Sequence, residues 1–271
     1  MVMASDFQLS KSGIRQNKIL ELLSINSAMS NYDLCAALGC SEATIRNDLK
    51  ALAEAGLITR TRGGASSKAT VTLDNFQTLH RIHTNEKEKK AIASFVLASG
   101  LVTPHSSIAI DIGSTCYLLA EALSKLDYPI DAAVNSLGIA SLLAMNPNIK
   151  IALAGGLYYP SLDSFDSATA LNFFSNMYFD YYFMGANGIS KTNGITCTLQ
   201  DNENRMPVKK LIAEHSEKVI VLADHSKINK TYMHGVCSIS KIAMIITDAC
   251  CSSEERESFM DLGIPVVFAA S

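Results

Sequence analysis

Short polar motifs follow several apolar runs in the second half of the chain, and their residue types suit the binding of an anion. Asp111 ends one such run, and Gly113, Ser114 and Thr115 follow it directly. Unpaired backbone amides and the positive end of the helix dipole attract phosphate to the start of a helix, and hydroxyl groups add further donors. The sequence DIGST (111–115) therefore predicts a phosphate-binding turn, with a helix that begins near Thr115.

Comparable motifs follow other apolar runs along the chain. They are VNS (134–136), AGG (154–156), GANGI (185–189) and DHSK (224–227), and Lys209 and Lys210 are expected to open a helix. A single Gly/Ser turn is weak evidence, because such turns often follow strands for conformational reasons alone. Their repetition favours a polar pocket for a small molecule over coincidence.

A parallel sheet would bring these motifs together. Helix-sized segments separate most of the β-rich runs, which lie at residues 107–112, 131–135, 149–154, 180–186, 218–223, 242–247 and 265–269. Strands that alternate with helices indicate a mostly parallel sheet covered by helices. Ligands of such folds bind at the carboxyl ends of the strands, where these motifs are expected.

The stretch GCSEATIRNDLKALAEAGLITRTRGGA (39–65) points to a different partner. Ile45, Leu49 and Leu52 recur at helical spacing, which predicts one buried stripe on a helix that Ser41 caps. Four hydrogen-bonding side chains are then expected on the parts of this helix that face away from the core: Thr44, Arg46, Asn47 and Lys50.

Two more helices precede this one. Apolar spacing predicts a first helix over residues 14–24, and Ser30 and Gly39 bound a short second helix. Asp33 resembles the reciprocal partner of Ser30 in a capping box. Two helices joined by a tight turn, the second of which exposes polar side chains, indicate a helix-turn-helix motif at about residues 29–48.

A wing is expected after the third helix, which Gly56 ends. The sequence LITRTRGGA alternates apolar and polar residues like a strand and then turns at Gly63 and Gly64. Arg60 and Arg62 of this wing can reach phosphates or a minor groove. The alternative from periodicity alone is a small helical cap with a solvated basic face.

The distribution of charge is compatible with a small DNA reader attached to an acidic body. Residues 1–68 hold eight Lys/Arg and six Asp/Glu, so this segment carries +2 and the remainder −5, which together give the net charge of −3. The mild overall acidity argues against a protein that coats nucleic acid without specificity.

Metal, cofactor and membrane chemistry have little support in the sequence. The seven cysteines form no CxxC pair, and His80/His83 and Cys250/Cys251 are interpreted as spectators with reduced thiols. We expect no metal and no cofactor. No apolar run is long enough to cross a bilayer and no signal peptide is evident, so a cytoplasmic protein is expected.

The two halves together resemble the DeoR family of bacterial transcriptional regulators from Ile14 to Ala269. The matching motifs are IRQNKILELL, SEATIRNDL, LITRTRGGA, the spaced F…R…N…EK (Phe76, Arg81, Asn85, Glu86–Lys87), DIGST, NS, AGGL, GANGI, GIT (194–196), VKK (208–210) and LADHSK (222–227). Their order and spacing make the resemblance specific.

This resemblance implies a winged helix-turn-helix domain at residues 13–66, a linker at 67–85 and an α/β sensor and oligomerisation domain at 86–271, related to ribose-5-phosphate isomerase-like folds. It implies a repressor of a carbohydrate-metabolism operon that binds double-stranded operator DNA and a phosphorylated sugar. The DNA-binding residues would be Ser41, Thr44, Arg46, Asn47, Lys50, Arg60 and Arg62. The effector-binding residues would be Asp111, Gly113, Ser114, Thr115, Asn135, Ser136, Gly155, Gly156, Gly185, Asn187 and Lys209.

The sequence departs from the family pattern at four places. Asn187 replaces the aspartate of the usual GADGI motif, and SFDSA (164–168) replaces a Val-Gly-Pro. Arg205-Met206-Pro207 stands where Glu-Ala-Glu is usual, and Asn47 replaces a second arginine of the recognition helix. The first three changes lie near the expected pocket, so they bear on the choice of effector.

Two other functions are compatible with these patterns. One is a sugar-phosphate isomerase-like enzyme with an accessory domain; Asp111 could act as a base, whereas Asn187 could not. The other is a protein-interaction module, although the basic face suits phosphates better than an apolar groove. A homo-oligomer, a dimer or a tetramer, is expected because one recognition helix reads too few base pairs to find a site among a genome's competitors.

Overall fold

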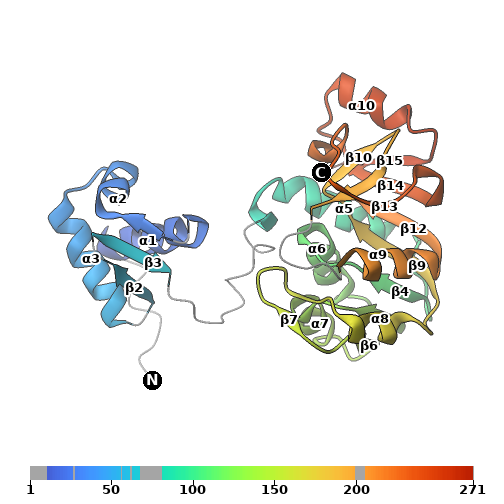
Figure 1. The fold of residues 1–271 in the computed structure, drawn as a ribbon, viewed down its shortest axis with the longest axis horizontal. Coiled ribbons are helices and arrows are strands. Elements are labelled where there is room, and N and C mark those ends of the chain that lie inside the picture. Colours follow the sequence, from blue (N-terminus) through green and yellow to red (C-terminus); the bar gives the residue numbers. More distant parts are fainter. Residues whose placement is uncertain are drawn as a thin grey trace. The chain divides into compact units, whose positions relative to one another are not determined.

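The computed structural model describes residues 11–26, 28–55, 57–61, 63–67, 81–198 and 205–270. The chain divides into two compact units, residues 1–75 and 76–271, and each is described by itself (Figure 1).

The first unit packs three helices against a small antiparallel sheet. Its elements are α1 (Lys11–Asn26), β1 (Ala28–Ser30), α2 (Asn31–Leu38), α3 (Glu42–Glu54), β2 (Ile58–Thr61) and β3 (Gly64–Ser67). The strands lie in the order β1-β3-β2. Its core consists of Ile19, Leu23, Leu34, Ile45, Leu49, Leu52, Ile58 and Ala65. The stripe predicted for the third helix therefore faces inward, and the sequence that was expected to form a wing forms β2 and β3.

Local side chains and one glycine bound the helices of this unit, as the sequence predicts. The Ser30 hydroxyl accepts a hydrogen bond from the Asp33 amide, and the Ser41 hydroxyl accepts one from the Thr44 amide, so both helices have capped N-termini. Gly39 ends α2 with φ at 62°, a left-handed conformation that favours glycine. The reciprocal half of the capping box differs, because the Asp33 carboxylate contacts the Ser30 hydroxyl, at 2.7 Å, where a backbone amide was expected.

A buried carboxylate joins α1 to α3. Asp48 is 3 % exposed and accepts hydrogen bonds from Ser12 (3.1 Å) and Gln16 (3.0 Å), and it forms an ion pair with Arg15. Burial alone would raise the pKa of Asp48, but the hydrogen bonds from Arg15, Gln16 and Ser12 outweigh it and lower that pKa. The helix that presents Arg46 and Asn47 is therefore held by charge as well as by apolar packing.

The second unit is built on a seven-stranded parallel sheet. Its strands are β4 (Ser107–Ile110), β5 (Ile130–Val134), β6 (Ile149–Leu153), β9 (Phe179–Gly185), β12 (Ser216–Leu222), β14 (Ile242–Asp248) and β15 (Val266–Ala269). They correspond one for one to the seven strands predicted from the sequence. Their order is β15-β14-β12-β9-β4-β5-β6, with every neighbouring pair parallel.

Helices cover both faces of this sheet. One core contains residues of α5 (Glu86–Ala98), α6 (Ser114–Leu123) and α7 (Leu137–Leu143). The other contains residues of α8 (Ala168–Phe174), α9 (Arg205–Glu214) and α10 (Ser253–Met260). Successive residues of β9 alternate between the two cores, since Tyr182 and Met184 lie in one and Phe183 in the other.

Smaller elements complete the unit and were not predicted. They are the hairpin β7 (Tyr158–Tyr159) and β8 (Ser164–Phe165), the antiparallel sheet of β10 (Gly188–Ser190), β11 (Gly194–Cys197) and β13 (His234–Cys237), and the 3-10 turns η2 (His225–Lys227) and η3 (Ile239–Lys241). One helix boundary is corrected. Lys209 and Lys210 do not open a helix, because α9 already includes Arg205 and tolerates Pro207 in its first turn.

The strand order changes direction between β4 and β9. From β4 the chain adds β5 and β6 on one side, and then it returns to the other side of β4 to add β9, β12, β14 and β15. Loops after β4 and β9 therefore lead away from each other and leave a crevice at the carboxyl ends of these strands, which is where open α/β sheets bind ligands.

The segment just before α5 belongs to the second unit. Ile82, expected in the linker 67–85, is 8 % exposed and lies in the core that contains α5 and α6. Residues 81–85 therefore differ from the expected linker; residues 68–80 lie outside the described part of the chain. In the described part, no helix has both the length and the apolar character needed to span a membrane.

Replacing Asp48 by Asn is expected to destabilise the first unit by about 2 kcal/mol or more, because it removes one member of a buried ion pair. Since the folded pKa is lowered, the contribution of Asp48 is present above its unfolded pKa and is lost as the pH falls through the folded pKa. Thermal unfolding of the full chain at pH 7 and pH 3 measures both effects.

The control is Glu54→Gln on the same helix, an exposed acid 3.9 Å from Lys50. It should leave the unfolding temperature unchanged, because exposed pairs contribute little. Equal effects of the two substitutions would contradict the role given to Asp48.

Candidate DNA-binding surface and effector cavity

The exposed face of α3 carries the predicted DNA-contacting side chains. Ser41, Arg46, Asn47 and Lys50 are exposed, and Thr44 is half-buried. Arg46 donates to Glu42 at 2.7 Å (Nη2 to Oε1), and this bond is the main reason why the pKa of Glu42 is lowered. Both groups are more than half exposed, so this pair is weak and DNA phosphates or bases can compete for Arg46.

Of the two arginines predicted to act in the wing, only Arg60 lies in the described part of the chain. Arg60 is exposed on β2 and pairs with Ala65 of β3. Arg62 lies outside the described residues. Gly64 allows this wing to close onto β1, because a Cβ there would lie 2.1 Å from the Met29 carbonyl oxygen.

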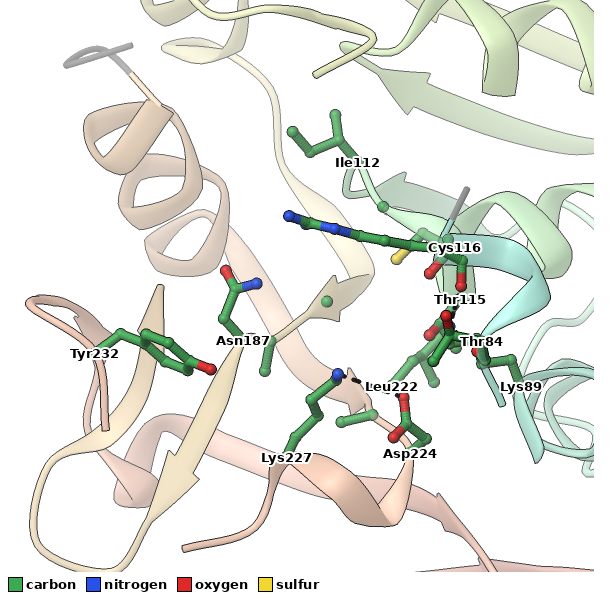
Figure 2. Close-up of a pocket in the computed structure, with 16 residues that line it drawn as sticks. Thr84, Lys89, Ile112, Thr115, Cys116, Asn187, Leu222, Asp224, Lys227 and Tyr232 are labelled. Atoms are coloured by element: carbon green, nitrogen blue, oxygen red, sulfur yellow. Dashed lines mark hydrogen bonds and ion pairs between the residues drawn. The ribbon is translucent and has the colours of Figure 1, made fainter. Parts of the chain in front are cut away.

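A cavity of about 270 Å³ lies at the carboxyl ends of β4, β9 and β12, where the strand order changes direction (Figure 2). It is lined by Arg81, Thr84, Lys89, Ile112, Gly113, Ser114, Thr115, Cys116, Gly185, Ala186, Asn187, Leu222, Ala223, Asp224, Lys227 and Tyr232. Five of the predicted effector-binding residues are among them: Gly113, Ser114, Thr115, Gly185 and Asn187.

The start of α6 supplies backbone donors to this cavity. Gly113 precedes the helix with φ at 118°, a conformation that favours glycine, and no side chain caps the helix there. The first helical hydrogen bond runs from the Tyr117 amide to the Gly113 carbonyl. The earlier amides of α6 thus have no helical acceptor, which is the arrangement that binds anions.

Asp111 and Lys209 support the cavity and are not part of its lining. They form an ion pair in which each residue is 2 % exposed. Asp111 also accepts a hydrogen bond from the Gly185 amide at 3.0 Å, and Lys209 donates to the Gly185 carbonyl at 2.9 Å. The pair therefore fixes the end of β9 against the end of β4.

The remaining predicted residues gather around the β7–β8 hairpin. Asn135 donates to Asp166 at 2.7 Å, and Ser136 donates to Asp163. Burial raises the pKa of Asp163, although hydrogen bonds from Ser136 and other donors oppose that rise. Gly155 and Gly156 begin the segment that leads to this hairpin, and none of these four predicted residues lines the cavity. Asp166 belongs to the SFDSA segment that departs from the family pattern.

Sequence reasoning missed several residues of the cavity. They are Arg81, Thr84, Lys89, Asp224, Lys227 and Tyr232. Arg81 belongs to the spaced F…R…N…EK motif, which had no assigned role. Asp224 and Lys227 belong to DHSK, which was counted among the motifs of the expected polar pocket, although neither residue was assigned to effector binding. Figure 2 shows Asp224 and Lys227 beside each other, with Asn187 and Tyr232 across from Thr115.

Lys89 is a buried cation that holds the segment before α5. It is 4 % exposed, and its ammonium group donates to the carbonyl oxygens of Arg81 and Thr84. Burial lowers the pKa of Lys89 to about 8. Lys89 therefore loses its positive charge, and the cavity becomes less positive, as the pH rises through about 8.

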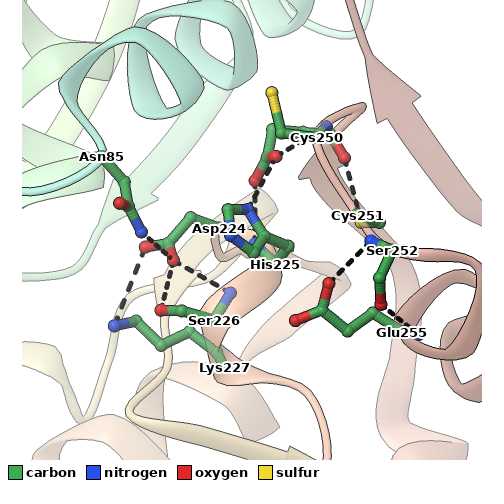
Figure 3. Close-up of polar contacts among 10 residues, drawn as sticks. Asn85, Asp224, His225, Ser226, Lys227, Cys250, Cys251, Ser252 and Glu255 are labelled. Atoms are coloured by element: carbon green, nitrogen blue, oxygen red, sulfur yellow. Dashed lines mark hydrogen bonds and ion pairs between the residues drawn. The ribbon is translucent and has the colours of Figure 1, made fainter.

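The DHSK turn after β12 is anchored to the neighbouring strand. His225, labelled in Figure 3, lies beside Asp224 and Ser226 in this turn. It contacts the buried carboxylate of Asp248 twice, from its amide at 2.8 Å and from Nδ1 at 2.9 Å. Partial burial would lower the pKa of His225, but the bond to Asp248 outweighs it and raises that pKa. The turn that carries Asp224 and Lys227 is thereby fixed at the end of the sheet.

Comparison with known proteins identifies both units. The model of a DeoR-like helix-turn-helix domain matches residues 15–71, and that of a DeoR C terminal sensor domain matches residues 84–249. The HTH-type transcriptional regulator GolR of Listeria innocua is 33 % identical over 94 % of this chain and 98 % of its own. The glycerol-3-phosphate regulon repressor of Escherichia coli is 31 % identical over 87 % of this chain and 90 % of its own.

Among solved structures, ribose 5 phosphate isomerase A from Neisseria gonorrhoeae is 23 % identical over 55 % of each chain, with a TM-score of 0.37. A likeness of this size has no bearing on activity. The Asp111 carboxylate is bound by Lys209 and Gly185 and does not line the cavity, and the Asn187 side chain, which does line it, has no basic group. The chain belongs to the DeoR family of DNA-binding transcriptional regulators, and it is not an enzyme.

Proposed function

We propose that this regulator represses a carbohydrate-metabolism operon and that a phosphorylated sugar or a related metabolite, bound in the cavity of the second unit, controls its affinity for operator DNA. The observation that carries this proposal is the lining of the cavity, which combines the start of α6 with Arg81, Lys89 and Lys227 against one acid, Asp224. Backbone amides and cations of this kind suit a phosphate group.

The relatives support the class of pathway. One is by its name a repressor of the glycerol-3-phosphate regulon. Asn187 changes the chemistry of this particular cavity, because an amide offers a donor where the family usually has a carboxylate. We therefore expect this chain to differ in its effector from relatives that keep the aspartate.

The proposed route of control runs through residues 81–85. Arg81 and Thr84 line the cavity, and Lys89 holds the carbonyl oxygens of both. A ligand that contacts this segment can alter DNA affinity only if it binds the DNA-competent and DNA-incompetent arrangements unequally. The proposed regulator acts in the cytoplasm, where its operator DNA would be.

Operator binding is proposed to use the exposed side chains of α3 and the wing, including Arg46, Asn47, Lys50, Arg60 and Arg62. A homo-oligomer is part of this proposal, because two recognition helices are needed to read a site of useful length.

Arg46→Ala is expected to cost about 1–3 kcal/mol of operator affinity and to relax specificity, because Arg46 is exposed on the helix face proposed to contact bases. Arg60→Ala should weaken binding to all sequences alike and reduce the salt dependence, as loss of a phosphate contact does. Titrations of operator and scrambled DNA at several salt concentrations measure both. An Arg46→Ala protein with unchanged selectivity would rule out a base contact.

Binding of sulfate, whose charge is constant above pH 4, is expected to weaken as the pH rises through about 8. The anion favours the protonated form of Lys89, whose pKa is about 8, so affinity can fall by at most about tenfold per pH unit above that value. Calorimetry from pH 7 to 9.5 tests this. Lys89→Gln should give a flat profile; a flat profile in the unaltered protein would contradict a role for Lys89 in anion binding.

Thr115→Val combined with Lys227→Met should leave operator binding intact and abolish the response to phosphorylated sugars, because one change alters the α6 turn and the other removes a cation. The control is Lys125→Met, an exposed lysine just beyond the C-terminal end of the same helix. A panel of three- to six-carbon sugar phosphates is tested for its effect on operator affinity by sedimentation, which also gives the mass of the bound species.

The proposal fails if no phosphate ester changes operator affinity, or if the double variant responds as fully as the control. A monomer on the operator would exclude the proposed oligomer. In a cellular reporter, higher expression after deletion of the regulator is the result expected of a repressor.

A further inference from the structure

One oxygen of Asp224 lacks a hydrogen bond from the described residues, although the side chain is almost fully buried. Asp224 is 1 % exposed and lines the cavity. Its Oδ2 atom receives no hydrogen bond within the described part of the chain, and its ion-pair partner, the Lys227 ammonium, lies 3.7 Å away. A buried carboxylate oxygen without a donor is costly, so its presence beside a cavity calls for a ligand that donates.

The other oxygen of the same carboxylate is fully used. Asp224 Oδ1 accepts hydrogen bonds from the Asn85 side chain at 2.9 Å, from the Ser226 amide at 3.1 Å and from the Ser226 hydroxyl at 2.5 Å (Figure 3). These donors fix the orientation of the side chain. The structural role of Asp224 therefore involves Oδ1, whereas Oδ2 receives no hydrogen bond from the described residues, although Asp224 lines the cavity.

Asp224 is ionised at neutral pH. Burial would raise its pKa, but the hydrogen bond from Ser226 and the charge of Lys227 outweigh burial and lower that pKa. An ionised carboxylate only accepts hydrogen bonds, and it repels phosphate. Its presence in a cavity that otherwise favours anions needs a reason other than anion binding.

We propose that Asp224 is the specificity-determining residue of the cavity and that its Oδ2 atom accepts a hydrogen bond from a hydroxyl group of the ligand. This inference rests on the proposed function and narrows the ligand to a phosphate ester with at least one hydroxyl group near the phosphate. A buried acceptor left unpaired disfavours phosphate esters without hydroxyl groups, and the charge of Asp224 weakens the binding of free inorganic anions without preventing it.

The test compares Asp224→Asn with the unaltered full chain. Asparagine keeps one oxygen for Asn85 and Ser226 and replaces the Oδ2 acceptor by a donor. The probes are the panel of phosphorylated polyols and sugars and propyl phosphate, which has no hydroxyl group, with affinities measured by calorimetry. Selectivity for the best-bound polyol phosphate over propyl phosphate should fall by about tenfold or more. Affinity for propyl phosphate should stay equal or increase, because a repulsive charge has been removed.

Ser226→Ala is the matched control, since it removes a donor to Oδ1 only, and its selectivity should stay close to that of the unaltered chain. A parallel loss of affinity for both kinds of probe in Asp224→Asn would show a purely structural residue and overturn the inference. Unchanged selectivity would also overturn it. If the Asn variant does not fold, Asp224→Ser, which leaves room for water, is compared in the same way.

The two levels of the proposal fail differently. If the unaltered chain binds none of the phosphate esters, the proposed function fails and this inference with it. If it binds polyol phosphates and propyl phosphate equally well, the phosphate-binding function stands and only the role of Asp224 is excluded.

Discussion

A buried ion pair between Asp111 and Lys209 holds together the place where the central sheet changes direction. Neither charge could stay in the interior alone, because the loss of hydration costs several kcal/mol for each ion unless a partner and further hydrogen bonds compensate. Here both partners also bond to Gly185, one to its amide and one to its carbonyl. The ends of β4 and β9 and the helix α9 are consequently fixed to one another.

The cavity depends on this arrangement. The turn Gly113–Thr115 follows Asp111 within two residues, and Asn187 follows Gly185 within two, so both inherit their positions from the pair. Lys209 therefore contributes by positioning rather than by contact with the cavity. The cations that do line the cavity come from elsewhere, namely from the segment before α5, from α5 itself and from the turn after β12.

In the DNA-binding unit, too, a buried carboxylate in an ion pair holds one element against another. Asp48 lies on α3 between the exposed residues Arg46, Asn47 and Lys50, but it points inward to Arg15 and Gln16 of α1. An apolar residue there would pack, but it would not fix the rotation of α3 about its axis through directed bonds. A helix that reads bases needs such a fixed rotation, because hydrogen bonds to base edges tolerate little displacement.

The sequence by itself determined the helices of the first unit, the seven strands of the parallel sheet and their order along the chain. Apolar periodicity located the three helices of the first unit and all seven strands of the parallel sheet, because burial on one face or on two faces leaves a periodic record in neighbouring residues. Cap residues such as Ser30, Gly39 and Ser41 marked helix ends through local hydrogen bonds and backbone conformation. The motif DIGST was placed correctly at the end of β4, since a strand end is also a local feature.

Only the tertiary structure decided which of these motifs share a cavity. Asn135 and Asp111 both follow central strands, yet Asn135 bonds to Asp166, just after the β7–β8 hairpin, and Asp111 bonds to Lys209, 98 residues away in the sequence. Conversely, Arg81 and Lys89 line the same cavity as Asp224, which lies more than a hundred residues further along the chain. Such meetings depend on strand order and on side-chain direction, and neither leaves a local pattern in one sequence. The chemical character of each motif could therefore be predicted from the sequence, whereas the residues that each motif contacts depend on the fold.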